Sequence, residues 1–242
     1  MDYDMRKLAE KFEQEIGKHN QNLEASIERL QKGQTYRNLS TVWVVPTRGS
    51  LKCKVVSNWM ALMRPMNQAV VGPVFFEGDE VGVAYQKAFE WVLSDPGLAK
   101  FKYILTVEED NLPPQDGLMK LYESIDKYDC VAGLYWTKGD NGQPMIYGDT
   151  KEKPMNFVPQ VPIPDSVQPC NGLGMGFNLW KLSSFRTKLK GMPKPWFKSV
   201  QEIGKAFTQD LWFFSQAAKY GFKCACDTRV KVGHLAEDGM VW

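Results

Sequence analysis

The chain has 242 residues, of which 43% are hydrophobic and 24% charged, and its formal net charge is +2 at pH 7. These proportions exclude a disordered or fibrous chain, and no apolar run approaches the roughly 20 residues that span a bilayer. Five cysteines at irregular spacing favour free thiols, and the polar N-terminal stretch lacks the apolar core of a secretory signal. We therefore expect a soluble, cytoplasmic protein with one large core.

The first predicted element is one long helix over residues 3–32, followed by Gly33 as a stop signal. Apolar side chains recur there at alternating steps of three and four, which is the spacing of one helix face. The stripe consists of Met5, Leu8, Phe12, Ile16, His19, Leu23, Ile27 and Leu30. Because it precedes the rest of the pattern, we divide the chain into a helical segment, 1–36, and a domain, 37–242. We expect the helix to brace the domain or to form a homodimer contact.

Strands and helices alternate over the rest of the chain. In chain order we predict strand 41–45, helix 51–63, strand 68–71, helix 79–93, strand 101–107, helix 115–127, strand 130–136, helix 208–220 and strand 223–226. This alternation is typical of an α/β domain with a mostly parallel, Rossmann-like central sheet flanked by helices. The sequence contains neither Gly-x-Gly-x-x-Gly nor a phosphate loop ending in Gly-Lys-Ser, so it supports neither a dehydrogenase nor a P-loop enzyme.

Three adjacent carboxylates, Glu108, Glu109 and Asp110, follow the predicted strand 101–107. The two prolines that come next cannot continue the strand, because proline has no N–H for the ladder, so the acids lie at its carboxyl edge. Ligands bind at that edge in open α/β sheets, and a divalent cation such as Mg or Mn would relieve the repulsion among the carboxylates. The alternative is a solvated turn that caps the next helix.

Three later features are also candidates for a site. Residues 171–177 contain three alternating glycines, so the backbone there closely approaches either a ligand or a neighbouring strand. Asp210 lies in the first turn of a helix for which Thr208 is the predicted N-cap, and it serves either the helix dipole or proton transfer. His234 follows a glycine near the end of an apolar stretch and is a metal-ligand candidate.

Taken in order, these features resemble the nucleotide-sugar-dependent glycosyltransferases of the GT-A fold, especially the family 2-like group, from about residue 40 to 238. The matching marks are Val45-Pro46-Thr47-Arg48, Glu108-Glu109-Asp110 in the place of an Asp-x-Asp motif, the glycine-rich Gly172–Phe177, Thr208-Gln209-Asp210 and His234. The sequence departs from the pattern at Glu108, which replaces an aspartate, and at Gln209, which replaces a glutamate. The aspartate that commonly holds the nucleotide base has no clear counterpart in residues 70–79.

The resemblance implies a donor site, a metal site and a general base. The donor-binding residues would be Pro46, Thr47, Arg48, Glu108, Glu109, Asp110, Gly174 and Gly176. Asp110 and His234 would hold Mn or Mg, with Glu108 contacting the ion or the ribose, and the ion would neutralise the leaving diphosphate as a Lewis acid. Asp210 would take the proton of the acceptor hydroxyl, a role that accompanies inversion at the anomeric carbon in the resembling enzymes.

A basic stretch precedes the last predicted helix, on the acceptor side of the resembling fold. Residues 166–201 contain no acid but include Lys188, Lys190, Lys194 and Trp196. One hypothesis is a polyanionic acceptor, such as DNA with a hydroxylated base or a phosphate-containing glycan, with lysines on phosphates and Trp196 stacked on a ring. Such a protein would resemble viral enzymes that glycosylate modified bases and would act in the host cytoplasm. The alternative is a basic surface balanced by acids from elsewhere.

Two other classes of function compete with glycosyl transfer. A sugar-1-phosphate nucleotidyltransferase would also place a metal at strand ends, but it requires a longer glycine-rich basic loop than residues 47–50 provide. A non-catalytic module that binds nucleotide sugars or glycans would account for the replacements at Glu108 and Gln209.

Overall fold

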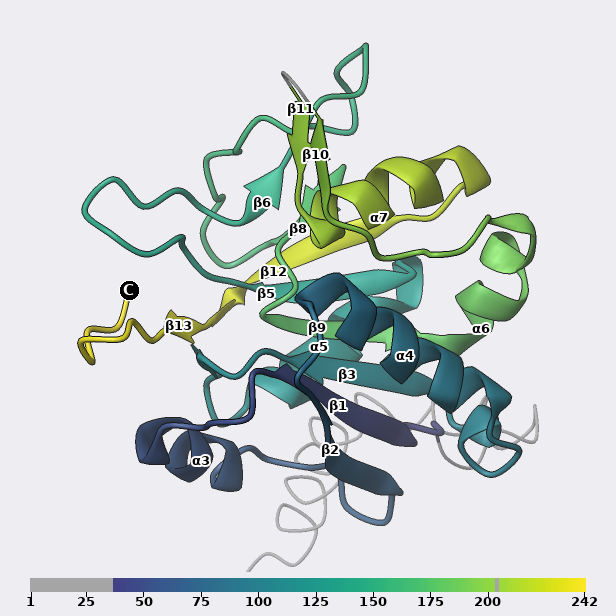
Figure 1. Cartoon of the computed structure of the whole chain (residues 1–242), viewed down its shortest axis with the longest axis vertical. Helices are drawn as coiled ribbons and strands as arrows, with labels where there is room; N and C mark the ends of the chain where they lie inside the picture. The colour runs from purple at the N-terminus through teal and green to yellow at the C-terminus, as the bar shows by residue number, and fades with distance from the viewer. Residues whose placement is uncertain (1–36, 203–204) are drawn as a thin grey trace, which may run out of the picture. The chain divides into compact units, whose positions relative to one another are not determined.

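The computed structural model describes residues 37–202 and 205–242 (Figure 1). Leu39–Trp242 forms one compact unit. The helix predicted over residues 3–32, with its bracing or dimerising role, lies outside the described residues. No helix within the described ranges is both long and apolar enough to cross a membrane.

Most of the strands belong to one central sheet. The strands are β1 (Thr41–Thr47), β2 (Val70–Glu77), β3 (Tyr103–Val107), β4 (Asn111–Leu112), β5 (Cys130–Leu134), β6 (Ile146–Tyr147), β7 (Val167–Cys170), β8 (Gly172–Leu173), β9 (Phe177–Lys181), β10 (Val200–Glu202), β11 (Lys205–Phe207), β12 (Cys224–Lys231) and β13 (Gly233–His234). The α-helices are α3 (Cys53–Met60), α4 (Val81–Ser94), α5 (Gly117–Ser124), α6 (Leu182–Arg186) and α7 (Gln209–Ala217). Short 3-10 turns are η1 (Leu98–Lys100), η2 (Ile125–Lys127), η3 (Lys188–Gly191) and η4 (Ala218–Tyr220).

The central sheet has seven strands in the order β2-β1-β3-β9-β5-β12-β7. β1 is parallel to β2 and β3, and β5 is parallel to β12, whereas β9 runs antiparallel between β3 and β5 and β7 runs antiparallel to β12. Because β9 opposes both of its neighbours, β3 and β5 point the same way. The carboxyl ends of β1, β2, β3, β5 and β12 therefore lie at one edge, which confirms the predicted α/β class with a largely parallel sheet flanked by helices.

The residues of β1 show how both faces of the sheet are buried. Val42 and Val44 belong to a core cluster with residues of α4, α6 and α7, whereas Trp43 and Val45 belong to a cluster with residues of α3 and α5. Successive side chains on a strand point to opposite faces, so a strand covered on both sides appears in the sequence as one continuous apolar run. The helices thus form a layer on each face of the sheet (Figure 1).

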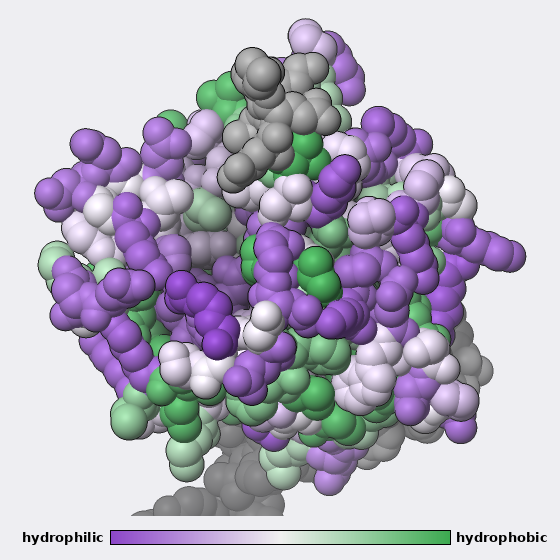
Figure 2. Space-filling view, in the orientation of Figure 1, coloured by the Kyte–Doolittle hydropathy of each residue, from purple (hydrophilic) through white to green (hydrophobic). Residues whose placement is uncertain are grey.

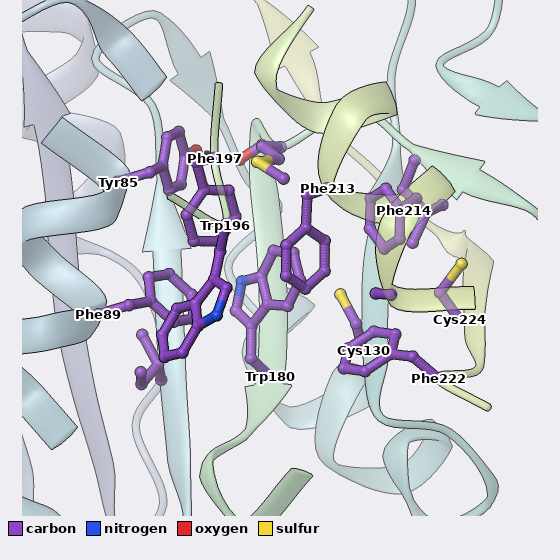
Figure 3. Close-up of a cluster of buried hydrophobic side chains, with 14 of the residues drawn as sticks. Tyr85, Phe89, Cys130, Trp180, Trp196, Phe197, Phe213, Phe214, Phe222 and Cys224 are labelled. Atoms are coloured by element: carbon purple, nitrogen blue, oxygen red, sulfur yellow. Dashed lines mark hydrogen bonds between the residues drawn. The ribbon is translucent and has the colours of Figure 1, made fainter. Parts of the chain in front are cut away.

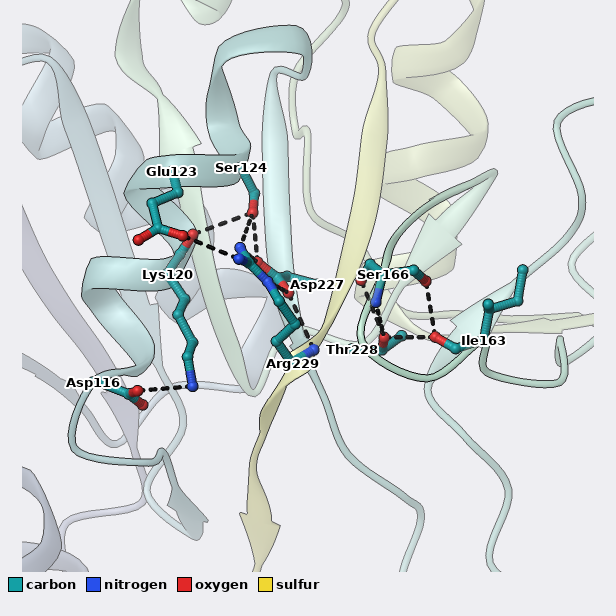
Figure 4. Close-up of polar contacts among 9 residues, drawn as sticks. All are labelled: Asp116, Lys120, Glu123, Ser124, Ile163, Ser166, Asp227, Thr228 and Arg229. Atoms are coloured by element: carbon teal, nitrogen blue, oxygen red, sulfur yellow. Dashed lines mark hydrogen bonds and ion pairs between the residues drawn. The ribbon is translucent and has the colours of Figure 1, made fainter. Parts of the chain in front are cut away.

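An ion pair between a buried aspartate and a half-buried arginine supports the strand that leads to the carboxyl edge. Asp227 of β12 is fully buried, and Arg229 donates to both of its oxygens, over 2.9 Å from Nε and 2.7 Å from Nη2. The hydroxyl of Ser124, at the end of α5, also donates to Asp227 (Figure 4). This network ties α5 to β12 where the register with β5 shifts. It therefore supports the segment that continues to His234.

Candidate active site

Two adjoining cavities lie at the carboxyl edge of the sheet. The first, of about 440 Å³, is bordered by the ends of β1 and β3 and by the first turn of α4. The second, of about 330 Å³, shares Arg48, Glu109 and Asp110 with the first and extends to residues after β5 and β13. Figure 2 shows a hollow on this face, bordered largely by hydrophilic side chains. The predicted donor-binding residues that border the first cavity are Pro46, Thr47, Arg48, Glu108, Glu109 and Asp110.

Glu109 is held by the residues that end β1. The Thr47 hydroxyl and the Arg48 backbone N–H donate to Glu109 Oε2 over 2.6 Å and 2.8 Å, and Arg48 Nε donates to Oε1 over 2.5 Å. Burial alone would raise the pKa of Glu109, but these donors outweigh it and lower the pKa below its usual value. Glu109 therefore fixes the turn after β1. Thr47, Arg48 and Glu109, which were all expected to bind the nucleotide-sugar donor, contact one another here.

Glu108 lies between Tyr85 of α4 and the glycine-rich segment. Its backbone N–H donates to the Gly176 carbonyl over 3.0 Å, and its Oε1 lies 3.0 Å from the Tyr85 hydroxyl, which is also 2.9 Å from the Met175 carbonyl. Removal from water, together with the charges of two nearby aspartates, raises the pKa of Glu108 to about 8. The Tyr85 hydroxyl donates to Glu108 Oε1 and lies within reach of the Met175 carbonyl, and this contact lowers the pKa of Glu108 by less than burial raises it. With a pKa of about 8, Glu108 is largely protonated near pH 7 in the metal-free protein.

The short ladder between β4 and β13 brings Asp110 and His234 together. Asn111 pairs with His234 across this ladder, and the Leu235 N–H donates to the Asp110 carbonyl over 2.7 Å. Asp110 Oδ2 lies 3.4 Å from His234 Nε2. His234 Nδ1 lies 2.7 Å from the Trp136 carbonyl. Because that carbonyl only accepts, Nδ1 carries a proton, and the ring is held with Nε2 toward Asp110.

The pair formed by Asp110 and His234 fits a divalent ion such as Mn. A carboxylate oxygen and an imidazole nitrogen are ligands that Mn accepts, and a hydrogen bond from the far ring nitrogen to a backbone carbonyl is the usual way to orient a metal-ligating histidine. Across residues 37–202 and 205–242, no group of three or more His, Cys, Asp or Glu side chains is placed to hold a metal. The protein would thus supply two ligands, and a bound phosphate and water would complete the set.

Lys138, which the sequence analysis did not single out, also reaches this pair. Its Nζ lies 2.5 Å from Asp110 Oδ2, the oxygen that faces His234. Burial would raise the pKa of Asp110, but the contacts with His234 and Lys138 outweigh it and lower the pKa to about 2. Asp110 is therefore ionised at every physiological pH.

Asp210 lies in the first turn of α7 and is buried, with 4% of its surface exposed. Thr208 precedes the helix, but its hydroxyl donates to the Asp210 carboxylate and does not cap the backbone. The Leu211 N–H donates to the same carboxylate over 2.8 Å. Burial raises the pKa of Asp210, and the charge of Asp210 contributes to the raised pKa of Glu108, so the two carboxyls interact. Gln209, the neighbour of Asp210, borders the first cavity.

The glycine-rich segment packs closely against other parts of the protein. A Cβ added at Gly174 would lie 2.2 Å from the Tyr135 hydroxyl, and one at Gly176 would lie 2.6 Å from the Asn111 amide. The Tyr135 hydroxyl also accepts a hydrogen bond from the Gly176 N–H over 3.0 Å. Neither glycine borders the two cavities. We therefore reassign both from donor binding to close packing beneath Glu108.

Most of the predicted acceptor-side residues are engaged within the protein. Lys188 Nζ lies 2.7 Å from a buried aspartate that precedes β5, and Lys194 Nζ lies 2.7 Å from a glutamate of α4. Trp196 is 6% exposed, and its ring centroid lies 5.3 Å from that of Phe185 in α6, within a cluster of buried aromatic side chains (Figure 3). The expectation that Trp196 stacks on an acceptor is wrong, because other rings enclose it. Lys190 is exposed.

Comparisons with known proteins bear on the fold. No protein-family model matches the sequence, and no curated protein matches it significantly. The crystal structure of A197 from STIV is similar over 84% of this chain and 88% of its own, with a TM-score of 0.58 and 20% identity. GalNAc-T7, solved with UDP, GalNAc and Mn2+, is similar over 83% of this chain and 44% of its own, with a TM-score of 0.51 and 12% identity. The fold is GT-A-like.

In this GT-A-like fold the cleft lies where the sequence analysis placed it, at the carboxyl ends of the parallel strands. The acids after β3, the turn after β1 and the hairpin after β5 line the two cavities, and the histidine of β13 contacts Asp110 at their edge. Side chains from four separate parts of the chain thus meet at one opening. Open α/β sheets bind ligands at this edge, so the cleft is the candidate active site.

Proposed function

We propose that this protein is a metal-dependent glycosyltransferase that moves a sugar from a nucleotide-sugar donor to a hydroxyl acceptor. The observation that carries the proposal is the meeting of Asp110 and His234 beside a cleft of about 440 Å³ in a GT-A-like fold. GalNAc-T7, which shares this fold, was solved with UDP, GalNAc and Mn2+. Membership of the family 2-like group, and transfer of a hexose or a pentose, are parts of the same proposal.

Each of these cleft residues would have a separate role in binding the nucleotide-sugar donor. A divalent ion, Mn or Mg, would be held by Asp110 and His234 and would neutralise the charge that grows on the leaving diphosphate. Glu108, which borders the same cavity, would contact the ion or the ribose of the donor. The side chain of Arg48 is 74% exposed at the cleft and offers its guanidinium to phosphate oxygens.

Asp210 would act as the general base and produce inversion at the anomeric carbon. Its raised pKa brings the carboxylate closer to the basicity that proton transfer near neutral pH requires. Because 4% of its surface is exposed, an acceptor hydroxyl has to reach Asp210 past neighbouring side chains. The contribution of the Asp210 charge to the raised pKa of Glu108 supports a base close to the proposed donor residues.

The acceptor is proposed from the charge distribution of the sequence and is a polyanion, DNA or a phosphate-containing glycan. Trp196 is buried, and Lys188 and Lys194 form ion pairs within the protein, so exposed Lys190 is the residue to test. Binding to DNA should weaken steeply as salt rises, and Lys190→Glu should flatten that slope. Absence of any association near about 50 mM salt would return the acceptor to a neutral sugar, a lipid or a protein.

Release of free sugar from a panel of nucleotide sugars, with and without Mn, tests the proposed function. We expect Mn-dependent hydrolysis by the natural protein and its loss in Asp110→Ala. Asp116→Ala is the matched control, because this aspartate forms an exposed ion pair with Lys120 on α5. Donor binding without hydrolysis or transfer would favour a non-catalytic binding module. Formation of a nucleotide sugar from a sugar 1-phosphate would favour a nucleotidyltransferase.

A further inference from the structure

Two nitrogen atoms from separate segments converge at the carboxylate of Asp110. Oδ2 of Asp110 is 2.5 Å from Lys138 Nζ and 3.4 Å from His234 Nε2. The side chains of Lys138 and Asp110 are 33% and 24% exposed, so the pair is reachable from the cleft. One carboxylate oxygen thus faces both a histidine nitrogen and an ammonium group.

The segment that carries Lys138 also orients the histidine. Trp136 and Lys138 belong to a hairpin after β5, in which the Thr137 N–H donates to the Gln143 carbonyl over 2.9 Å. The Trp136 carbonyl accepts from His234 Nδ1, and two residues later Lys138 reaches Asp110. The hairpin therefore fixes the ring and supplies a cation at the same point.

We propose that Lys138 is an internal cation that competes with the divalent ion for Asp110 and, once displaced, binds the donor diphosphate. This inference rests on the proposed function. An ammonium and a divalent ion on the same carboxylate oxygen repel one another, so binding of the ion requires Lys138 to leave. Lys138 borders the second cavity together with two other cations, Arg48 and Lys52, and with the acids Glu109, Asp110 and Glu237. The displaced ammonium would stay in this cavity, beside the ion, where it could donate to a diphosphate oxygen.

The consequence is a pair of effects with opposite signs. Removing the ammonium frees Asp110 and should tighten binding of Mn alone. It also removes a phosphate contact and should weaken binding of a nucleoside diphosphate when Mn is saturating. A substitution that merely damaged the fold would weaken both, so the combination separates competition from a structural role.

Lys138→Met and the natural protein should be titrated calorimetrically with Mn alone, and then with UDP at saturating Mn. We expect Mn affinity to rise roughly fivefold in Lys138→Met, the upper end for a partly exposed ion pair, and UDP affinity to fall by a similar factor. Lys120→Met is the matched control: its ion pair with Asp116 has a similar distance, 2.7 Å, and a side-chain exposure of 30%, but lies on α5 away from the cleft. It should leave both affinities unchanged.

Each outcome bears on the inference separately from the proposed function. Equal Mn affinity in Lys138→Met and the natural protein would overturn the competition, and equal UDP affinity would overturn the role in diphosphate binding. If neither protein binds Mn although both bind UDP, the inference fails while a donor site remains. Absence of UDP binding in both proteins would count against the proposed function itself.

Discussion

Replacing Glu108 by glutamine should flatten the pH dependence of the stability of the metal-free protein. The pKa of Glu108 is about 8 in the folded protein, against an ordinary value of 4.5. Between these values the folded protein keeps a proton that the unfolded chain has released, so the free energy of unfolding falls as the pH rises. Glutamine keeps the shape and the hydrogen-bond donor of the protonated acid but cannot ionise.

The size of the effect follows from the same two values. The difference of 3.5 units between 8 and 4.5 corresponds to an upper limit of about 5 kcal/mol, at ~1.36 kcal/mol per unit. Glu108 borders the first cavity, where water screens the charges of its neighbours. We therefore expect about 2 kcal/mol of the limit to be observed.

Urea unfolding followed by tryptophan fluorescence, with EDTA present, at about pH 5 and about pH 8.5, measures this effect. The natural protein should lose about 2 kcal/mol more than Glu108→Gln on going to the higher pH. Glu152→Gln, which removes an exposed carboxyl outside the cleft, should behave as the natural protein does. Equal losses in the natural protein and Glu108→Gln would refute the reasoning, because Glu108 would then titrate normally in the folded state.

Asp110→Ala and His234→Ala should each abolish Mn-dependent binding of a nucleoside diphosphate in calorimetric titrations, and unchanged affinity in both would remove the metal assignment. Asp210→Asn should keep donor affinity but lower the rate of transfer by roughly 10²-fold or more, because the amide cannot accept a proton; near-normal turnover would end the general-base role. Asp227→Asn should lower the free energy of unfolding by about 2 kcal/mol, since it weakens charge-assisted hydrogen bonds between a fully buried carboxylate and Arg229, whose side chain is 33% exposed. A loss below about 1 kcal/mol in urea unfolding, the range of exposed pairs, would contradict that estimate.

The position of the cleft could be predicted from the sequence because it depends on local signals. An apolar run followed by acids and prolines fixes the acids at the end of a strand, and the ends of parallel strands share one edge. The same rule could have placed Lys138 near the acids, because it follows the predicted strand 130–136. Tyr85 gives no such signal, since on an amphipathic helix it is indistinguishable from a core residue; its hydroxyl contact with Glu108 depends on the tertiary fold.

Other features depended on contacts between distant segments and could not be read from local patterns. The glycines of residues 171–177 indicate a close approach of the backbone, but the sequence does not say whether to a ligand or to another part of the protein. In the structure, Tyr135 and Asn111 lie against Gly174 and Gly176. Trp196 lies in a basic stretch, yet its ring is buried because the aromatic residues of other elements surround it. Strand β9 was not predicted. Its position between β3 and β5 depends on the order of strands in the sheet, which local sequence patterns do not show.

The most direct test of the proposed site is a crystal structure of the protein grown with UDP and Mn, with anomalous scattering used to locate the ion. We expect an anomalous peak between Asp110 Oδ2 and His234 Nε2, with the diphosphate beside it and the nucleoside in the first cavity. An ordered nucleotide in that cavity with the ion held elsewhere, or a nucleotide bound away from the carboxyl edge of the sheet, would contradict it.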